Sequence, residues 1–191
     1  MVMKWPGTIK PGRIVNDITA GEDFLPTILA ACGDPDITGK LLDSLQVGDK
    51  TFKTHLDGYN FMPFLRGDAV EGPRKEFFYF TDNGDLTALR YGDWKLSFKT
   101  IKGNLFTGTP ESTNVPLVTN LRQDPWERYQ DESMMYARWW GDKLWTMVPG
   151  VNIVGRFLLT FREYPPSQVG GSLSIERALQ MVQNGASGGG K

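Results

Sequence analysis

The sequence has 191 residues, of which 40% are hydrophobic, and it contains six tryptophans and eleven phenylalanines. This apolar and aromatic content is enough for a packed core and excludes a globally disordered chain. Twenty-one basic and 22 acidic residues give a net charge of -1, so we expect no nucleic-acid partner. No continuous apolar run reaches the roughly 18 residues of a membrane span, and no span is expected. A single cysteine excludes an internal disulfide and leaves the cellular compartment open.

The first third of the chain predicts one strand and one helix. Residues 1–5 alternate weakly in polarity and end at a Pro-Gly turn, as a strand would. Residues 21–33 predict a helix, with acids and a proline in its first turn and a glycine after its last turn. Residues 34–60 are rich in Asp, Gly and Thr and are expected to form a loop, followed by a short helical turn around 61–66. The helix would carry an apolar face made of Leu25, Ile28, Leu29 and Cys32.

The middle of the chain predicts an antiparallel sheet. Strand-like runs are separated by turn signals of the Asp-Asn-Gly-Asp and Gly-Asp type, which favour a meander. The expected strands are 76–81, 86–91, 94–100 and 116–121.

The last third predicts helices. Large apolar residues recur at helical spacing in 132–148, up to Pro149-Gly150, and again in 151–161. A short helix near 174–183 and a flexible tail over 184–191 complete the chain. The sequence therefore predicts an α+β fold, in which the helix near 132–148 covers one face of a four-stranded antiparallel sheet.

Several phrases, in this order, resemble the C-terminal region of the type I sulfatases, the arylsulfatase family with an alkaline-phosphatase-like fold. The resemblance covers about residues 1–180. The matching phrases are Lys4-Trp5-Pro6-Gly7 with Ile9-Lys10-Pro11-Gly12, Asp23-Phe24-Leu25-Pro26-Thr27 with Gly33, His55-Leu56-Asp57-Gly58-Tyr59-Asn60, Arg90-Tyr91-Gly92-Asp93-Trp94-Lys95, Asn120-Leu121-Arg122-Gln123-Asp124-Pro125-Trp126-Glu127, and 161–168.

The resemblance implies a division into parts. Residues 1–65 would be the terminal strand and helix of the α/β sulfatase domain, left without their neighbours. Residues 66–183 would form the C-terminal sulfatase subdomain, followed by the tail over 184–191. The partner implied is the missing N-terminal catalytic domain, and a periplasmic or secreted location is possible by resemblance.

The resemblance also implies a chemistry that this chain does not contain. Family enzymes hydrolyse sulfate monoesters with a formylglycine, made from the cysteine of a Cys-x-Pro/Ala-x-Arg motif, and with a divalent cation, calcium by resemblance. Here Cys32 is followed by Gly33, Asp34 and Pro35, so that motif is absent. We therefore expect no catalytic residue, no metal ligand and no cofactor in this chain, and no activity of the chain alone.

His55, the single histidine, is the one candidate for a substrate-rim residue. The alternative, which we favour, is a loop anchor bonded to nearby backbone or carboxylate, because lone histidines are common structural groups. In the same phrase Asp57 is expected to accept backbone N–H bonds, and Gly58 to adopt a positive φ. Cys32 is expected to be a small buried apolar group rather than a nucleophile.

The remaining polar and aromatic motifs have structural interpretations that we favour over binding. Asp93 would close a turn, Trp94 would pack on a helix and Lys95 would face solvent. Asp124 would cap a helix that begins at Pro125, although Arg122 and Arg128 could together bind an anion. The Trp139, Trp140 and Trp145 cluster could be a sugar platform, but helical spacing favours a core that covers the sheet.

Three alternatives to the sulfatase interpretation stay open. The chain could be a stand-alone module that binds a sulfated glycan, although its basic residues are scattered. It could be the tail of a related phosphate or phosphonate ester hydrolase of the same superfamily. It could also be a non-functional fragment.

Overall fold

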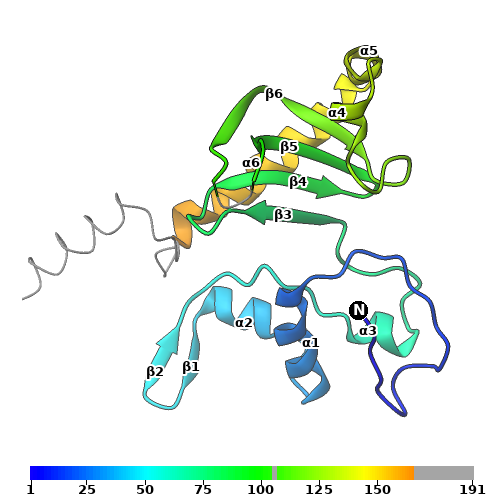
Figure 1. Cartoon of the computed structure of the whole chain (residues 1–191). Coiled ribbons are helices and arrows are strands. Elements are labelled where there is room, and N and C mark those ends of the chain that lie inside the picture. Colours follow the sequence, from blue (N-terminus) through cyan, green and yellow to red (C-terminus); the bar gives the residue numbers. More distant parts are fainter. Residues whose placement is uncertain (105–106, 166–191) are drawn as a thin grey trace, which may run out of the picture.

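The computed structural model describes residues 1–104 and 107–165, which form two parts joined by the chain around residues 66–75 (Figure 1). The first part is mostly helical and carries a small hairpin. The second part is a sheet with helices on one face. The predicted helix near 174–183 and the tail over 184–191 lie outside the described residues.

The N-terminal part consists of an extended N-terminal segment, short helices and a small hairpin. Its elements are a 3₁₀ turn at Gly21–Asp23, α1 (Phe24–Ala31), α2 (Ile37–Asp43), the antiparallel hairpin of β1 (Leu45–Val47) and β2 (Lys50–Phe52), and α3 (Met62–Arg66). Its buried apolar residues come from α2 and α3, with Ile37, Leu41, Phe61, Met62 and Phe64 inside.

The C-terminal part is an antiparallel sheet of four strands in the order β3-β4-β5-β6. The strands are β3 (Glu76–Phe80), β4 (Leu86–Tyr91), β5 (Trp94–Ile101) and β6 (Pro110–Asn120). Register places one apolar row across the sheet, because side chains two residues apart share a face. That row is Phe78, Leu89, Leu96 and Val118. The predicted α+β fold with a four-stranded antiparallel sheet is confirmed.

Helices from the end of the described chain cover this row. They are α4 (Tyr129–Glu132), α5 (Tyr136–Asp142), a 3₁₀ turn at Leu144–Thr146 and α6 (Met147–Glu163), which crosses the sheet (Figure 1). Phe157 of α6 stacks on Phe78 with ring centroids 3.9 Å apart. At the other end, the Tyr136 hydroxyl exchanges hydrogen bonds with the backbone of Val118.

Two predictions about the N-terminal part were wrong. Residues 1–5 form no strand, since no other described strand lies beside them to pair with their backbone. Residues 34–60 are not all loop, because they contain α2 and the β1-β2 hairpin. Ile37 and Leu41, one helical turn apart, bury one face of α2, and Gly48 takes the positive φ that the hairpin turn needs.

The predicted helix over 132–148 was also wrong in its limits. That stretch divides into α4, α5 and a 3₁₀ turn, and the main helix on the sheet is α6. Pro149 does not end a helix, because it stands in the first turn of α6, where a proline costs no intrahelical hydrogen bond. The Trp cluster packs partly as expected: Trp94 contacts Trp139 and Trp145, and the Trp140 indole donates to the Pro116 carbonyl.

The helical stretch Leu144–Glu163 is the one candidate membrane span among the described residues by length and composition, with a mean hydropathy of 1.3 and 11% of its residues buried. Asn152, Gly155 and Arg156 interrupt its apolar residues, so it contains no long continuous apolar run. One side of the stretch packs on the sheet through Gly150 and Phe157, and the other side is exposed at Val148, Val151, Leu158 and Leu159.

Two glycines of α6 predict opposite effects of the same substitution. A methyl group on Gly150 would lie 2.2 Å from Cδ1 of the buried Leu96, whereas one on Gly155 would meet no atom within 4 Å. We expect Gly155→Ala to raise the free energy of unfolding by about 0.5–1 kcal/mol. We expect Gly150→Ala to lower it by about 1–3 kcal/mol, because overpacking outweighs the helix propensity. Urea denaturation of both variants measures this, and equal effects would contradict the packing of α6.

Candidate functional site

The predicted rim residue, His55, lines a groove of about 890 Å³ between the two parts of the molecule. One wall is the loop 55–60, and the others are β3 and α6. The groove lining includes the aromatic residues Phe77, Phe78, Phe80 and Phe157 together with several charged residues. Those charged residues are Glu22, Asp57, Arg74, Lys75, Glu76 and Arg156.

His55 is held at the edge of this groove by two contacts. Its Nδ1 lies 3.0 Å from Oδ1 of Asp57, and its ring lies 5.8 Å from the ring of Tyr164. Its Nε2 has no hydrogen-bond partner among the described residues. The first contact is the carboxylate bond of a loop anchor. The free Nε2 leaves the substrate-rim role as a prediction.

The loop is positioned by a buried ion pair between Asp23 and Arg74. The two side chains are only 5% and 2% exposed, and the Arg74 Nη2 donates to Asp23 Oδ1 over 2.6 Å. Asp23 also accepts from the backbone N–H of Ala20 and of Tyr59, each over 2.8 Å. Arg74 in turn donates to the carbonyl of Asp57 over 2.8 Å. One carboxylate and one guanidinium therefore fix the start of α1, the His55 loop and the start of β3 together.

Arg74 keeps its charge in this environment. Burial lowers the pKa of its guanidinium, but the hydrogen bond and the negative charge of Asp23, with the charge of Glu22, raise that pKa above its ordinary value. A buried charge that is both paired and hydrogen-bonded satisfies the condition under which ions are tolerated inside proteins.

Gly58 is required by a close approach rather than by its backbone angles. The expected positive φ is absent, and Gly58 is buried against the first turn before α1. A Cβ atom here would lie 2.1 Å from the backbone oxygen of Glu22. Asp57 also departs from expectation, because its side chain contacts His55 instead of closing the turn.

Tyr59 has a strongly raised hydroxyl pKa in the groove. Its hydroxyl donates to the carboxylate of Glu76, and its ring lies under the Arg74 guanidinium, 4.8 Å from centroid to Cζ. Burial first, and then the hydrogen bond and charge of Glu76, raise the pKa of Tyr59 to about 12. The phenol is therefore neutral at ordinary pH and acts here as a hydrogen-bond donor.

This pKa predicts a measurable alkaline titration. Because the folded pKa is raised, Tyr59 contributes stability that is complete below pH 10 and is lost as pH rises toward 12. We expect the ultraviolet titration of the tyrosines to lose a late step near pH 12 in Tyr59→Phe. The unfolding free energy of the variant should also fall less steeply from pH 10 to 12. A titration with the same late step in the variant would contradict the assignment.

The groove does not fit a divalent cation. Such a cation needs several oxygen ligands that are free to converge on it. The carboxylates of Asp23, Asp57 and Glu76 each already bind a hydrogen-bond donor or a cation. No group of three or more His, Cys, Asp or Glu side chains that could hold a metal ion occurs in the part of the chain that the structure describes.

The motifs near the sheet have structural roles, with two corrections. Lys95 does not face solvent: its side chain is 16% exposed, lies over the Tyr79 ring and pairs with Glu127 over 2.6 Å. The Asp124 carboxylate accepts from the backbone N–H of Arg128 and Tyr129 at the start of α4, but the N-cap residue of this helix is Arg128 rather than Asp124. The helix begins at Tyr129 rather than at the predicted Pro125. Arg122 pairs with Asp93, and Arg128 pairs with Glu132.

The apolar face of α1 is largely exposed, and the expectation that Cys32 is buried was wrong. Leu25 is 51% and Ile28 is 53% exposed, and Cys32 is exposed at the end of the helix. Pro26 and Thr27 are buried instead, since that side of α1 packs on the His55 loop through the Thr27 hydroxyl, which accepts from the backbone N–H of Phe61. The apolar face made of Leu25, Ile28 and Cys32 therefore has no covering element among the described residues.

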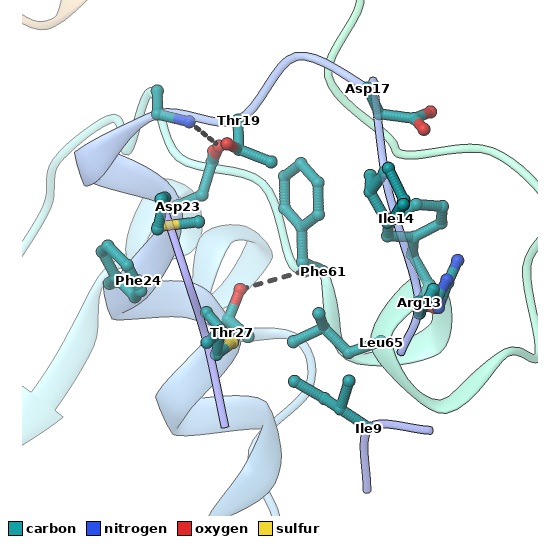
Figure 2. Close-up of a pocket in the computed structure, with 15 residues that line it drawn as sticks. Ile9, Arg13, Ile14, Asp17, Thr19, Asp23, Phe24, Thr27, Phe61 and Leu65 are labelled. Carbon is teal, nitrogen blue, oxygen red and sulfur yellow. Dashed lines mark hydrogen bonds between the residues drawn. The ribbon is translucent and has the colours of Figure 1, made fainter. Parts of the chain in front are cut away.

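A second apolar opening lies beside α1 (Figure 2). It has a volume of about 390 Å³ between α1, α3 and the N-terminal segment. In Figure 2, Ile9 and Ile14 of that segment lie opposite Phe24 and Thr27 of α1. Its apolar lining residues are Met1, Met3, Ile9, Ile14, Val15, Phe24, Phe61, Phe64 and Leu65.

Comparison with known proteins bears on the resemblance stated from the motifs. No family model matches the sequence. The steryl-sulfatase of Mus musculus is 29% identical to this chain over an alignment of 146 residues, which covers 66% of this chain and 21% of the mouse protein. This chain is similar to a sulfatase. A sulfatase structure, PsFucS1 from Pseudoalteromonas sp., has 22% identity and a TM-score of 0.49, over 61% of this chain and 23% of that one.

The chain thus spans about a fifth of the length of the curated relative that it matches. The sulfatase resemblance is supported, and the division into 1–65, 66–183 and 184–191 stays a prediction. Sequence reasoning missed Arg74, the residue that joins both parts. Its only sequence signal was weak: Arg74 directly follows the Gly72-Pro73 turn and lies shortly before the apolar run that forms β3.

Proposed function

We propose that this chain is the C-terminal portion of a sulfatase, and that the groups which hydrolyse the sulfate ester lie in a catalytic domain outside it. The observation that supports this is the similarity to a sulfatase over two thirds of the chain but only a fifth of the relative. The described residues also contain no Cys-x-Pro/Ala-x-Arg motif and no group of side chains fit for a cation. By family resemblance, the intact enzyme would use a formylglycine and a calcium ion.

We propose that the catalytic domain docks on the exposed surface around α1. The exposed Leu25 and Ile28 of α1, and the apolar opening lined by Phe24 of the same helix, would be buried by a neighbouring domain. Exposed apolar surface of this kind marks an interaction site in soluble proteins. The proposed role of this chain is to complete the α/β domain through residues 1–65 and to support it through the sheet. The His55 loop then stands at the edge of the intact molecule, where His55 is the one side chain proposed to touch substrate.

Activity tests the first half of the proposal. We expect no turnover of 4-nitrophenyl sulfate by the purified 191-residue chain, with or without added calcium. Measurable turnover by protein that mass spectrometry shows to lack formylglycine would contradict it.

The docking surface predicts a reactive thiol. Because Cys32 is exposed, a thiol reagent such as Ellman's reagent should label it in the folded chain nearly as fast as in urea. Co-expressed with its catalytic domain, the chain should bury this face, and the rate of labelling should fall at least tenfold. Equal rates in the assembled protein would contradict docking at α1.

Charge substitutions locate the surface independently. Leu25→Asp with Ile28→Asp should abolish co-purification of the chain with the catalytic domain. Val70→Asp is the matched control, since Val70 is 94% exposed and is not part of α1. Co-purification of the double variant at the level of the unsubstituted chain would contradict the proposal.

A further inference from the structure

A third cleft, remote from α1 and from His55, has the composition of a binding site. It has a volume of about 470 Å³ and lies between the end of β6, the loop 121–128 and helices α4 and α5. That volume falls within the roughly 300–1,000 Å³ of small-molecule sites. Its aromatic residues are Trp126, Tyr129, Tyr136 and Trp139.

The aromatic wall of the cleft is fixed in place. The Tyr129 ring meets Trp139 edge to face, with centroids 5.7 Å apart, and meets Tyr136 in the same way at 6.0 Å. The Tyr136 hydroxyl both accepts from the N–H of Val118 and donates to its carbonyl, which ties the wall to the sheet. Preorganised aromatic faces bind with little loss of side-chain entropy.

Trp126 stands at the mouth of this wall and is held outward. It is 80% exposed, and it has no ring partner or hydrogen bond among the described residues. The loop that carries it is anchored on both sides: Asp124 accepts two backbone N–H bonds, and Glu127, at φ 55, pairs with Lys95. A loop anchored on both sides thus displays a large apolar ring to solvent.

The charged residues that line the cleft, Asp124, Arg128 and Glu132, have partners, and four uncharged polar groups there have none among the described residues. The side-chain amides of Gln123 and Gln130, the indole N–H of Trp139 and the hydroxyl of Tyr129 make no hydrogen bond to other described residues. The two nearby cations are neutralised, since Arg122 pairs with Asp93 over 2.9 Å and Arg128 pairs with Glu132 over 2.7 Å. Neutral donors and acceptors beside aromatic faces suit a ligand with many hydroxyl groups and an apolar face, and free cations for a sulfate or phosphate are absent from this described cleft.

We propose that this cleft binds a neutral sugar unit. The C–H face of a pyranose would stack on Trp126, and its hydroxyls would exchange hydrogen bonds with Gln123, Gln130 and the indole N–H of Trp139. The proposal does not depend on the proposed sulfatase function. Sugar binding by the isolated chain would neither support nor contradict the sulfatase proposal. Failure of the sulfatase proposal would likewise leave the sugar site in place.

The test uses the 191-residue chain and neutral oligosaccharides of glucose, galactose, mannose and xylose, with dextran sulfate as the charged probe. Binding is followed by saturation-transfer NMR of the sugar and by tryptophan fluorescence. We expect a neutral oligosaccharide to bind with a millimolar or tighter Kd, and Trp126→Ala to weaken that binding about tenfold or more. Trp126→Phe should retain part of the affinity, since it keeps an aromatic face.

Trp145→Ala is the matched control, because Trp145 is also exposed but lies outside the cleft. Its affinity for the sugar should be unchanged. The proposal is overturned if no neutral saccharide binds at tens of millimolar, or if Trp126→Ala binds as tightly as the natural chain. Exclusive binding of dextran sulfate that disappears at moderate salt would also overturn it, in favour of a charged ligand.

Discussion

Replacing Arg74 by methionine is expected to lower the free energy of unfolding by about 3–5 kcal/mol, the cost of leaving a buried charge without its partner. Arg74 is 2% exposed in its side chain and binds both oxygens of Asp23. Methionine matches much of its volume but leaves the Asp23 carboxylate buried beside only two backbone N–H groups. Urea denaturation followed by circular dichroism measures the loss.

An exposed ion pair provides the matched control for this effect. Arg122 and Asp93 have side chains that are 69% and 49% exposed, so Arg122→Met should cost less than about 1 kcal/mol. The double variant Asp23→Asn with Arg74→Met should recover part of the loss, since it removes both buried charges. A change below about 1 kcal/mol in Arg74→Met would show that the pair does not join the two parts.

Gly58→Ala is expected to lower the free energy of unfolding by about 3 kcal/mol, at the upper end of overpacking effects. The added methyl would lie 2.1 Å from the Glu22 oxygen and 3.1 Å from Cδ of Pro26. Both neighbours belong to the backbone or to a ring, so no side-chain rotation can make room. The loop must therefore move away from α1 and weaken the bond from the Tyr59 N–H to Asp23.

Hydrogen exchange tests this displacement more directly than stability does. The Tyr59 amide, bonded to Asp23 over 2.8 Å, should exchange much faster in Gly58→Ala. Gly21→Ala is the control at the same junction, because a methyl there meets no atom within 4 Å, and its stability should stay within about 0.5 kcal/mol. Unchanged protection of Tyr59 in Gly58→Ala would contradict the close approach.

The sheet could be predicted because its signals are local. Turn residues such as Gly84 and Gly92, both at positive φ, separate apolar runs of strand length, so each strand lies within a few residues of its predicted limits except at the start of β6. The helices were harder to predict, because a proline such as Pro149 occurs in the first turn of a helix as well as just after a helix ends. Only the packing of Gly150 on Leu96 shows that α6 continues past it.

The candidate site could be predicted only in part, because its contacts are distant in sequence. His55 and Asp57 are neighbours in one phrase, and the sequence marked both. Asp23 and Arg74 are 51 residues apart, and neither has a pattern that announces a buried pair. The exposure of Cys32 was missed for a related reason, since an apolar helix face shows that something covers it but not whether that element is in this chain.

The gene sequence upstream of the Met1 codon tests the central proposal most directly. The proposal predicts an open reading frame of about 300 further residues, the size of an added large domain, that contains a Cys-x-Pro/Ala-x-Arg motif. A different nucleophile motif there would indicate a phosphate or phosphonate ester hydrolase instead. An in-frame stop codon directly upstream would contradict the proposal, because no catalytic domain would then be joined to this chain.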